Sequence, residues 1–414
     1  MLKSGELKIM AKSTIKKQQK IRKPDFFLYW LVMPVFRLLA NLLVRFKVEK
    51  DKKIIKMGTP IVAIGSHTCM MDVAFMLLAL SPIRLNIVCG RDVFTWKPVK
   101  PIQKAAGLLP INQFEMDLTS IRLMKKAVSS GCSIALFPEG KISLDGRPLS
   151  NMNFKSIAKL LKFLDANVVF SHNYGGYSAR PRWFHGFRRG KIIQKCKILF
   201  TREELKELSV DEVYNKLKKE FTFNDAEFQQ EHQLRYKSKT PAKGLNYILY
   251  KCPKCGAEYE MECDGNFLSC TACGNRVQYT EYGEFIPDEG SVAFDRLDKW
   301  YDYEKESVNK ELDNPDFRLS YPVVWEQANS DYVYEEMGEG ELFVDHKEIG
   351  FIGKDLQGNE VKIITPIAYL PTVVQKTQEA IDLTVNNVVN RFYFRDGKYS
   401  AKYNLIVEEA YKRI

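Results

Sequence analysis

The stretch Ile61-Val-Ala-Ile-Gly-Ser-His67-Thr-Cys-Met-Met-Asp72 joins two kinds of hydrophobic pattern. Residues 61–65 form a short apolar run closed by glycine, which is typical of a buried strand. From 71 to 80 the apolar side chains recur at helical spacing, so a helix is predicted to follow directly. His67 is therefore expected at a strand-to-helix turn, with Asp72 about one helical turn further on.

The same alternation continues along the chain. Further strands are predicted at 85–89, 132–137 and 167–171, and further helices at 118–129, 154–164 and 203–221. Strands that alternate with helices indicate an α/β fold with a mostly parallel sheet and helices on its faces. We therefore expect one such domain over residues 58–240.

His67 and Asp72 have the residue types of a general base and its orienting partner. A hydroxyl is a poor nucleophile at neutral pH, and a histidine within hydrogen-bond reach can take its proton during attack on a carbonyl. A carboxylate on the other imidazole nitrogen fixes the tautomer and stabilises the imidazolium. Taken alone, the spacing is also compatible with a capping histidine and a solvated aspartate.

A second motif, Phe137-Pro-Glu-Gly140, comes at the end of the predicted strand 132–137. Ligands of open parallel sheets bind at the carboxyl ends of the strands. We expect Glu139 to accept hydrogen bonds from ligand hydroxyl groups there, and Gly140 to let the ligand approach the backbone closely. A plain turn between strand and helix is the alternative, because proline and glycine are common in such turns.

The two motifs together resemble the glycerolipid acyltransferases, most closely the 1-acylglycerol-3-phosphate (lysophosphatidic acid) acyltransferases. The resemblance covers roughly residues 25–235. It implies the fold of that family, with His67 as general base on the acceptor hydroxyl and Asp72 as its orienting partner. Glu139 and Gly140 would then shape the glycerol-phosphate site. The resemblance also implies acyl-CoA or acyl-carrier protein as donor and an N-terminal two-helix element that rests on the membrane.

Three positions depart from the pattern of that family. Ser66 stands where asparagine usually precedes the histidine, Gln113 where a phosphate-binding arginine is usual, and Ile142 where an arginine follows the second motif. The two missing arginines leave the binding of an acceptor phosphate open. Lys141 is a candidate to take over part of that task as a point charge.

Other cations are candidates for the same role. Arg180 and Arg182 lie among aromatic residues, and a guanidinium fork binds phosphate well, although an exposed basic loop touching lipid headgroups explains them equally. Arg91 is a further candidate. His172 and His185 have no positioned carboxylate partner in the sequence and are interpreted as structural.

Two matched Cys-x-x-Cys-Gly turns give the clearest metal signal. Four thiolates at this spacing provide the tetrahedral sulfur ligation of a structural zinc site. A closed site of this kind supplies folding energy to a small insert, so a zinc ribbon is predicted over 248–284, with redox-active dithiols as the alternative. Cys263, inside the loop, is not expected to bind. The expected ligands are Cys252, Cys255, Cys270 and Cys273.

The first 60 residues carry 15 Lys and Arg against 4 Asp and Glu. Residues 1–25 are predicted to form a basic arm, and 26–57 one or two helices in the membrane interface, because Pro34 and Arg37 interrupt the apolar run. No small-residue cleavage site follows, and nine cysteines, an odd number, fit a reducing compartment. We expect a peripheral or monotopic protein on the cytoplasmic face of a membrane; a buried amphipathic helix of a soluble domain is the alternative.

Residues 281–414 are acidic, with 15 Lys and Arg against 27 Asp and Glu. A small β-rich domain of pleckstrin-like texture is predicted over 285–414, with turns at Gly358-Asn359 and Asp396-Gly397 and a closing helix over 405–414. Its negative charge favours a protein contact or packing against the basic part of the chain. The predicted strands are 341–344, 348–352, 361–365, 390–394 and 398–403.

The expected activity is transfer of a fatty acyl group from acyl-CoA or acyl-carrier protein to the free hydroxyl of a lysophospholipid. The acceptor that we expect first is 1-acyl-glycerol-3-phosphate, which would make the reaction a step of phospholipid synthesis. Because of the missing arginines, glycerol-3-phosphate and an aminoacyl lipid remain alternative acceptors. A zinc-ribbon nucleic-acid-binding protein is the hypothesis from another class. The basic excess lies away from the ribbon, so we expect membrane lipids and no nucleic acid as partners.

Overall fold

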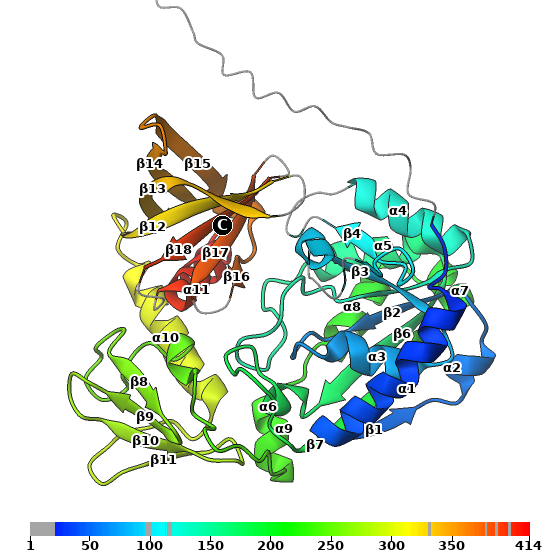
Figure 1. Ribbon diagram of the computed structural model, residues 1–414, viewed down its shortest axis with the longest axis horizontal. Helices are drawn as coiled ribbons and strands as arrows, with labels where there is room; N and C mark the ends of the chain where they lie inside the picture. Colours follow the sequence, from blue (N-terminus) through cyan, green and yellow to red (C-terminus); the bar gives the residue numbers. More distant parts are fainter. Residues whose placement is uncertain are drawn as a thin grey trace, which may run out of the picture.

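The computed structural model describes residues 21–95, 99, 101–111, 113, 118–329, 333–376, 379–385, 388–395 and 399–414. It contains an α/β domain, a small four-stranded ribbon and a C-terminal β domain (Figure 1). The long helix α10 (Leu297–Glu311) lies between the ribbon and the C-terminal sheet. Most of the predicted basic arm, and the dipeptide Asp396-Gly397, fall outside the described residues.

The α/β domain is built on a seven-stranded sheet with the order β1-β7-β6-β2-β5-β3-β4. The neighbours β6, β2, β5, β3 and β4 are parallel, whereas β7 is antiparallel to β6 and parallel to β1. This confirms the predicted fold class of a mostly parallel sheet flanked by helices. The strands are β1 (Arg45–Lys50), β2 (Ile61–Gly65), β3 (Leu85–Gly90), β4 (Leu109–Ile111), β5 (Ser133–Leu136), β6 (Asn167–Tyr174) and β7 (Lys191–Phe200).

Alternating side chains of the strands separate two cores. Val62 and Ile64 of β2 pack on one face with α4, α5 and α8, and Ile61 and Ala63 pack on the other face with α3. Because parallel strands end at one edge, the connections after β2 and β5 meet there and bring the two motifs together. The helices are α2 (Lys53–Lys56), α3 (Asp72–Leu80), α4 (Leu118–Ser129), α5 (Phe154–Leu164), α6 (Gly176–Ala179), α7 (Arg202–Glu207), α8 (Val210–Glu220) and α9 (Asp225–His232), with a 3₁₀ helix at Arg91–Thr95.

The predicted single helix over 203–221 is wrong, since α7 and α8 are separate helices. Ser209 divides them, because its side chain accepts the backbone N–H of Glu212 while the Glu212 carboxylate accepts that of Ser209. The strand predicted at 167–171 also runs further, to Tyr174, because it pairs with β7 as well as with β2.

Only part of the segment 26–57, predicted as interfacial helices, is helical. Helix α1 (Phe26–Leu43) continues through Pro34, and the chain then enters β1 at the edge of the main sheet. Asp25 caps α1 by accepting the N–H of Leu28 at 2.9 Å. Tyr29 packs into a core shared with α3.

The other side of α1 exposes a band of large apolar side chains. Among the described residues, α1 is the one helix long and apolar enough to cross a membrane, and 17% of it is buried. One side of α1 therefore packs against the protein, and the other is exposed. The exposed apolar residues are Phe26, Phe27, Trp30, Leu31, Val35, Leu38, Leu39 and Leu42.

The ribbon, α10 and the C-terminal sheet share one hydrophobic core. Leu268 and Val277 of the ribbon, Trp300 of α10 and Phe351 of the sheet belong to the same buried cluster. The ribbon also extends past its predicted end at residue 284, because β11 pairs with β10. Its strands are β8 (Met261–Asp264), β9 (Phe267–Cys270), β10 (Arg276–Tyr279) and β11 (Phe285–Pro287), and a 3₁₀ helix (Leu245–Tyr247) precedes them.

The C-terminal domain is a seven-stranded antiparallel sheet with the order β15-β14-β13-β12-β18-β17-β16, packed against helix α11 (Ser400–Tyr411). The strand predicted at 398–403 is wrong, because α11 begins at Ser400. Residues 400–410 are all buried, so no helical period is visible in the sequence. The strands are β12 (Arg318–Ala328), β13 (Tyr334–Asp345), β14 (Glu348–Asp355), β15 (Glu360–Pro366), β16 (Val374–Lys376), β17 (Ala380–Val385) and β18 (Val388–Phe394), with a 3₁₀ helix at Ile367–Tyr369.

Candidate functional site

His67 and Asp72 meet at the carboxyl end of β2. His67 lies in the connection to α3, and Asp72 is the first residue of that helix. The Nδ1 atom of His67 is 2.8 Å from Oδ2 of Asp72. Because an ionised carboxylate only accepts, Nδ1–H donates, and the lone pair on Nε2 is left to take a proton. The His67 side chain is 19% exposed and that of Asp72 1%, so the ring reaches solvent while its partner is buried.

Further donors fix the orientation of the Asp72 carboxylate. Oδ2 also accepts the backbone N–H of Cys69 at 3.0 Å, and Oδ1 accepts the Cys69 thiol at 3.1 Å and the side-chain amide of Asn173. Burial, together with the charge of Asp72, raises the pKa of the Cys69 thiol well above its usual range, so this thiol remains a donor. No motif singles out Asn173, and its only sequence signal is a polar residue next to an apolar strand run.

Phe137 and Glu139 of the second motif both contact His67. The Phe137 and His67 rings stack with centroids 4.6 Å apart. Glu139 Oε1 accepts the backbone N–H of His67 at 2.7 Å, and Oε2 accepts that of Leu149 at 3.1 Å. Burial raises the pKa of Glu139 to about 8, against the effect of these two donors. Glu139 is 1% exposed, and both its carboxylate oxygens bind backbone N–H groups, so it orders the backbone on either side of the site.

Gly140 and Gln113 are joined directly. The φ of Gly140 is +70°, in the left-handed region that favours glycine. Its carbonyl accepts the Gln113 side-chain amide at 2.5 Å. Gln113 stands where the resembled family usually has a phosphate-binding arginine, and here it binds the backbone of the second motif.

Lys141 is engaged by the C-terminal domain. Its ammonium donates to Glu408 Oε1 at 2.5 Å, to Asn404 Oδ1 at 2.7 Å and to the Thr372 hydroxyl. The Lys141 side chain is 12% exposed and that of Glu408 6%. Burial lowers the pKa of Lys141, while Glu408 acts in the opposite direction. The structure thus pairs this candidate phosphate ligand with a carboxylate of α11.

The three candidate arginines have different surroundings. Arg91 follows β3, the strand next to β5, which puts it at the same sheet edge as the second motif. The Arg180 guanidinium carbon lies 4.5 Å from the centroid of the Phe187 ring. Arg182 donates to the carbonyl of Gln375 in the C-terminal domain. Arg182 also lies near enough to Lys141, directly after the second motif, to lower the pKa of that lysine.

Ser66 and His172 form a buried pair behind the site. The Ser66 hydroxyl is hydrogen-bonded to Nδ1 of His172, which links the connection after β2 to β6. Burial lowers the pKa of His172 to about 3, so its ring is neutral at physiological pH. Its ring centroid lies 4.2 Å from that of Phe223. These contacts agree with the structural role inferred for His172.

The four predicted zinc ligands gather in the ribbon. All their sulfur atoms lie within 4.8 Å of one another, and the Sγ–Sγ distances are 3.7 Å for Cys252 and Cys273 and 3.9 Å for Cys255 and Cys270. Zn–S bonds of about 2.3 Å in a tetrahedron put sulfurs about 3.8 Å apart, so the donor set fits zinc. Cys263 Sγ instead accepts the N–H of Asn246 at 3.4 Å.

Comparisons with known proteins address the α/β domain. Residues 45–168 match a protein-family model described as Acyltransferase, and this range contains both motifs. Among solved structures, the chain is similar to the 1-acyl-sn-glycerophosphate (LPA) acyltransferase PlsC from Thermotoga maritima. The identity is 18%, the TM-score is 0.38, and the match covers 48% of this chain and 82% of that one. No curated protein sequence matches the chain significantly.

Proposed function

Because residues 45–168 match the acyltransferase family model, we propose that the chain transfers a fatty acyl group from acyl-CoA or acyl-carrier protein to a lysophospholipid hydroxyl. The preferred acceptor is 1-acyl-glycerol-3-phosphate, and the reaction would be a step of phospholipid synthesis. The observation that carries the proposal is the 2.8 Å contact between Nδ1 of His67 and the buried carboxylate of Asp72.

His67 acts twice in this reaction. Nε2 takes the proton of the acceptor hydroxyl as the hydroxyl oxygen attacks the thioester carbonyl and forms the new C–O bond. The C–S bond of the tetrahedral intermediate then breaks, and the imidazolium returns the proton to the leaving thiolate. Asp72 keeps the ring in the required tautomer and stabilises its charged form. The products are the acylated lipid and the free thiol of the donor.

A second class of acceptor lacks a phosphate monoester. The Gln113 amide binds the Gly140 carbonyl, Ile142 is buried, and the Lys141 ammonium is paired with Glu408. Each of these positions is therefore occupied by something other than a free cation. This arrangement favours an aminoacyl lipid as the second candidate, because a phosphate monoester, in glycerol-3-phosphate as in 1-acyl-glycerol-3-phosphate, needs cations.

Membrane attachment at the cytoplasmic face belongs to the same proposal. The exposed apolar band of α1 would enter the interface, and the exposed Arg37 of the same helix would meet anionic headgroups. The attachment would be peripheral or monotopic, since residues 45–50 return to the sheet of the soluble domain. An acceptor lipid could then reach His67 without leaving the bilayer surface.

Zinc completes the proposed composition. Cys252, Cys255, Cys270 and Cys273 would hold it with no open position, so its contribution would be the folding energy of the ribbon. The ribbon lies on the core that includes α10, and a metal there would stabilise the C-terminal domain as well.

A substrate panel tests the proposal. Purified full-length protein in vesicles is given acyl-CoA or acyl-carrier protein and, separately, 1-acyl-glycerol-3-phosphate, other lysophospholipids, glycerol-3-phosphate and an aminoacyl lysolipid. Products are identified by mass. Diacyl product from 1-acyl-glycerol-3-phosphate supports the first acceptor, and product only from acceptors without a phosphate monoester supports the second. No acylated product from any pair would contradict acyl transfer.

A further inference from the structure

We propose that Glu408 of α11 is a positioning residue of the acyltransfer site, acting on His67 through the loop 139–151. The inference rests on the proposed function, because it assigns the role of the C-terminal domain in that reaction. Three successive sets of contacts carry it, from His67 outward to α11.

The first set joins the loop to the backbone of His67. Glu139 Oε1 accepts the His67 N–H at 2.7 Å, and the Ser143 N–H donates to the His67 carbonyl at 2.7 Å. Both backbone polar groups of His67 are thus bound by residues of one loop. A displacement of this loop must therefore move the imidazole relative to its substrates.

The second set joins the loop to α11 at a residue between Glu139 and Ser143. The Lys141 ammonium is bonded to Glu408 Oε1, Asn404 Oδ1 and the Thr372 hydroxyl, and Glu408 also accepts the Thr372 hydroxyl at 2.6 Å. The cluster is buried, so Lys141 without Glu408 would be an uncompensated charge in a low-dielectric environment. The loop conformation consequently depends on a carboxylate more than 260 residues away.

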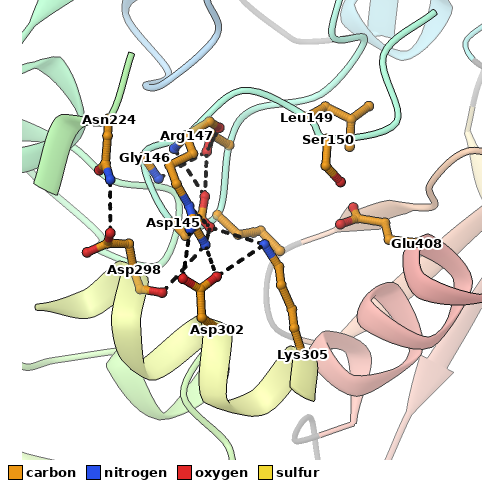
Figure 2. A network of polar contacts seen from close by, with 12 residues as sticks. Asp145, Gly146, Arg147, Leu149, Ser150, Asn224, Asp298, Asp302, Lys305 and Glu408 are labelled. Atoms are coloured by element: carbon orange, nitrogen blue, oxygen red, sulfur yellow. Dashed lines mark hydrogen bonds and ion pairs between the residues drawn. The ribbon is translucent and has the colours of Figure 1, made fainter. Parts of the chain in front are cut away.

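The third set holds the far end of the loop. The Asn151 side-chain amide donates to the carbonyls of Pro371 and Glu408 at 2.9 and 2.8 Å. Figure 2 shows Asp145 and Arg147 facing Asp302 and Lys305 of α10, and Glu408 of α11 beside the same loop. The segment 139–151 contains no helix or strand, so tertiary contacts order it, and the contacts with α10 and α11 are among them.

The charge distribution agrees with this role. The C-terminal 134 residues have 12 more acidic than basic side chains, whereas residues 61–280 have 12 more basic ones. Lys141 with Glu408, and Arg147 with Asp302, are pairs across that division. The acidic domain is therefore complementary to the basic domain that it packs against.

Lys141 as a phosphate ligand makes the opposite prediction for the same variant. If the lysine bound the acceptor phosphate, Glu408→Gln would free its charge, and the KM for a phosphate-bearing acceptor would fall while kcat stayed constant. If Glu408 positions the loop, Glu408→Gln leaves a buried lysine unpaired, and kcat falls because the site is displaced.

Three variants and one control test the proposal in the full-length protein. We expect Glu408→Gln to lower kcat about tenfold with little change in the KM of the acyl donor. Glu408→Gln combined with Lys141→Met removes both charges, and we expect it to regain most of that loss. Lys141→Met alone leaves Glu408 unpaired and is expected to resemble Glu408→Gln. The control is Asp382→Asn, which breaks a similarly buried pair with Arg391 in the same domain without touching the loop.

Hydrogen–deuterium exchange gives a readout that does not depend on activity. Glu408→Gln should raise deuterium uptake in peptides covering 66–72, and Asp382→Asn should not. If Glu408→Gln had the same deuterium uptake and the same kcat as the wild type, the inference would be overturned, but the proposed acyl transfer would not. A lower KM for the acceptor at constant kcat would overturn it in the same way. If the wild-type protein transfers no acyl group, the proposed function falls, and uptake at 66–72 still shows whether α11 orders the turn.

Discussion

The side-chain amide of Asn173 donates to Oδ1 of Asp72, on the carboxylate oxygen opposite the one that binds His67. Asn173 is 1% exposed, so we expect it to act on catalysis through its partners, chiefly through Asp72. Gly176 makes room for this contact, because a Cβ there would lie 1.5 Å from the Asn173 side-chain oxygen. Two strands and a turn thus converge on one buried carboxylate.

Asn173→Ala should lower kcat by about ten- to a hundredfold with an unchanged KM, since one hydrogen bond to a charged group is worth about 1.5–3 kcal/mol. Steady-state kinetics on vesicles measure this. Asn167→Ala, on the same strand but remote from Asp72, is the matched control. An equal loss in the control would show that damage to β6, and not the orientation of Asp72, is responsible.

His172 predicts how stability depends on pH. Its pKa is lowered by burial from 6.5 to about 3, with Lys195 acting in the same direction and Asp72 against it. The unfolded chain therefore binds this proton before the folded chain does, and the free energy of unfolding falls as the pH drops below 6.5. By pH 5 the loss is about 2 kcal/mol.

Urea denaturation at pH 7.5 and pH 5 measures this loss. Between the two pH values, the free energy of unfolding of His172→Phe should decrease by about 2 kcal/mol less than that of the wild type. His185→Gln, at an exposed histidine, should behave like the wild type. If His172→Phe and the wild type decreased equally, His172 would not be the group that takes up the proton.

The ribbon should contain one zinc ion that stabilises more than the ribbon itself. Cys255→Ser should abolish bound zinc and lower the Tm of the chain, because the ribbon shares its core with α10 and the C-terminal sheet. Cys263→Ser, at a cysteine outside the cluster, should retain zinc. Metal analysis and calorimetry are the measurements, and zinc retained in Cys255→Ser would contradict the four-sulfur site.

Helix α1 should determine membrane attachment. Leu31→Lys with Leu38→Lys places two charges in the exposed apolar band and should reduce co-sedimentation with anionic vesicles about tenfold or more. Asn41→Gln changes an exposed polar position of the same helix without adding charge and should leave binding unchanged. Unchanged binding of the double variant would assign attachment to another surface.

The pattern of apolar residues along the sequence was sufficient to predict many helices and strands of the α/β domain. Strand β2 and helices α4 and α5 have the predicted bounds, because each has a clear apolar period or run. The meeting of the two motifs also follows from parallel strands that end at one edge. The four-cysteine cluster follows from spacing alone.

Contacts between segments far apart in the sequence could not be predicted from such local patterns. Lys141 reads as a free cation next to the second motif, and only the packing of α11 shows that Glu408 is its partner. Helix α11 itself was predicted partly as a strand, since a helix buried on all sides has no polar face. The backbone N–H groups of His67 and Leu149 that Glu139 accepts are likewise invisible in the sequence, because they lie 72 and 10 residues away from it.

The central claim is that His67 is the base of an acyl transfer reaction. The most direct measurement is the rate of acylated lipid formation by His67→Ala, purified in parallel with the wild type and shown by circular dichroism to be equally folded. We predict that the wild type forms acylated lipid and that the rate is lower by at least about a thousandfold in His67→Ala. Vesicle binding should be the same in both proteins. Acyl transfer by His67→Ala at the wild-type rate would contradict the assignment.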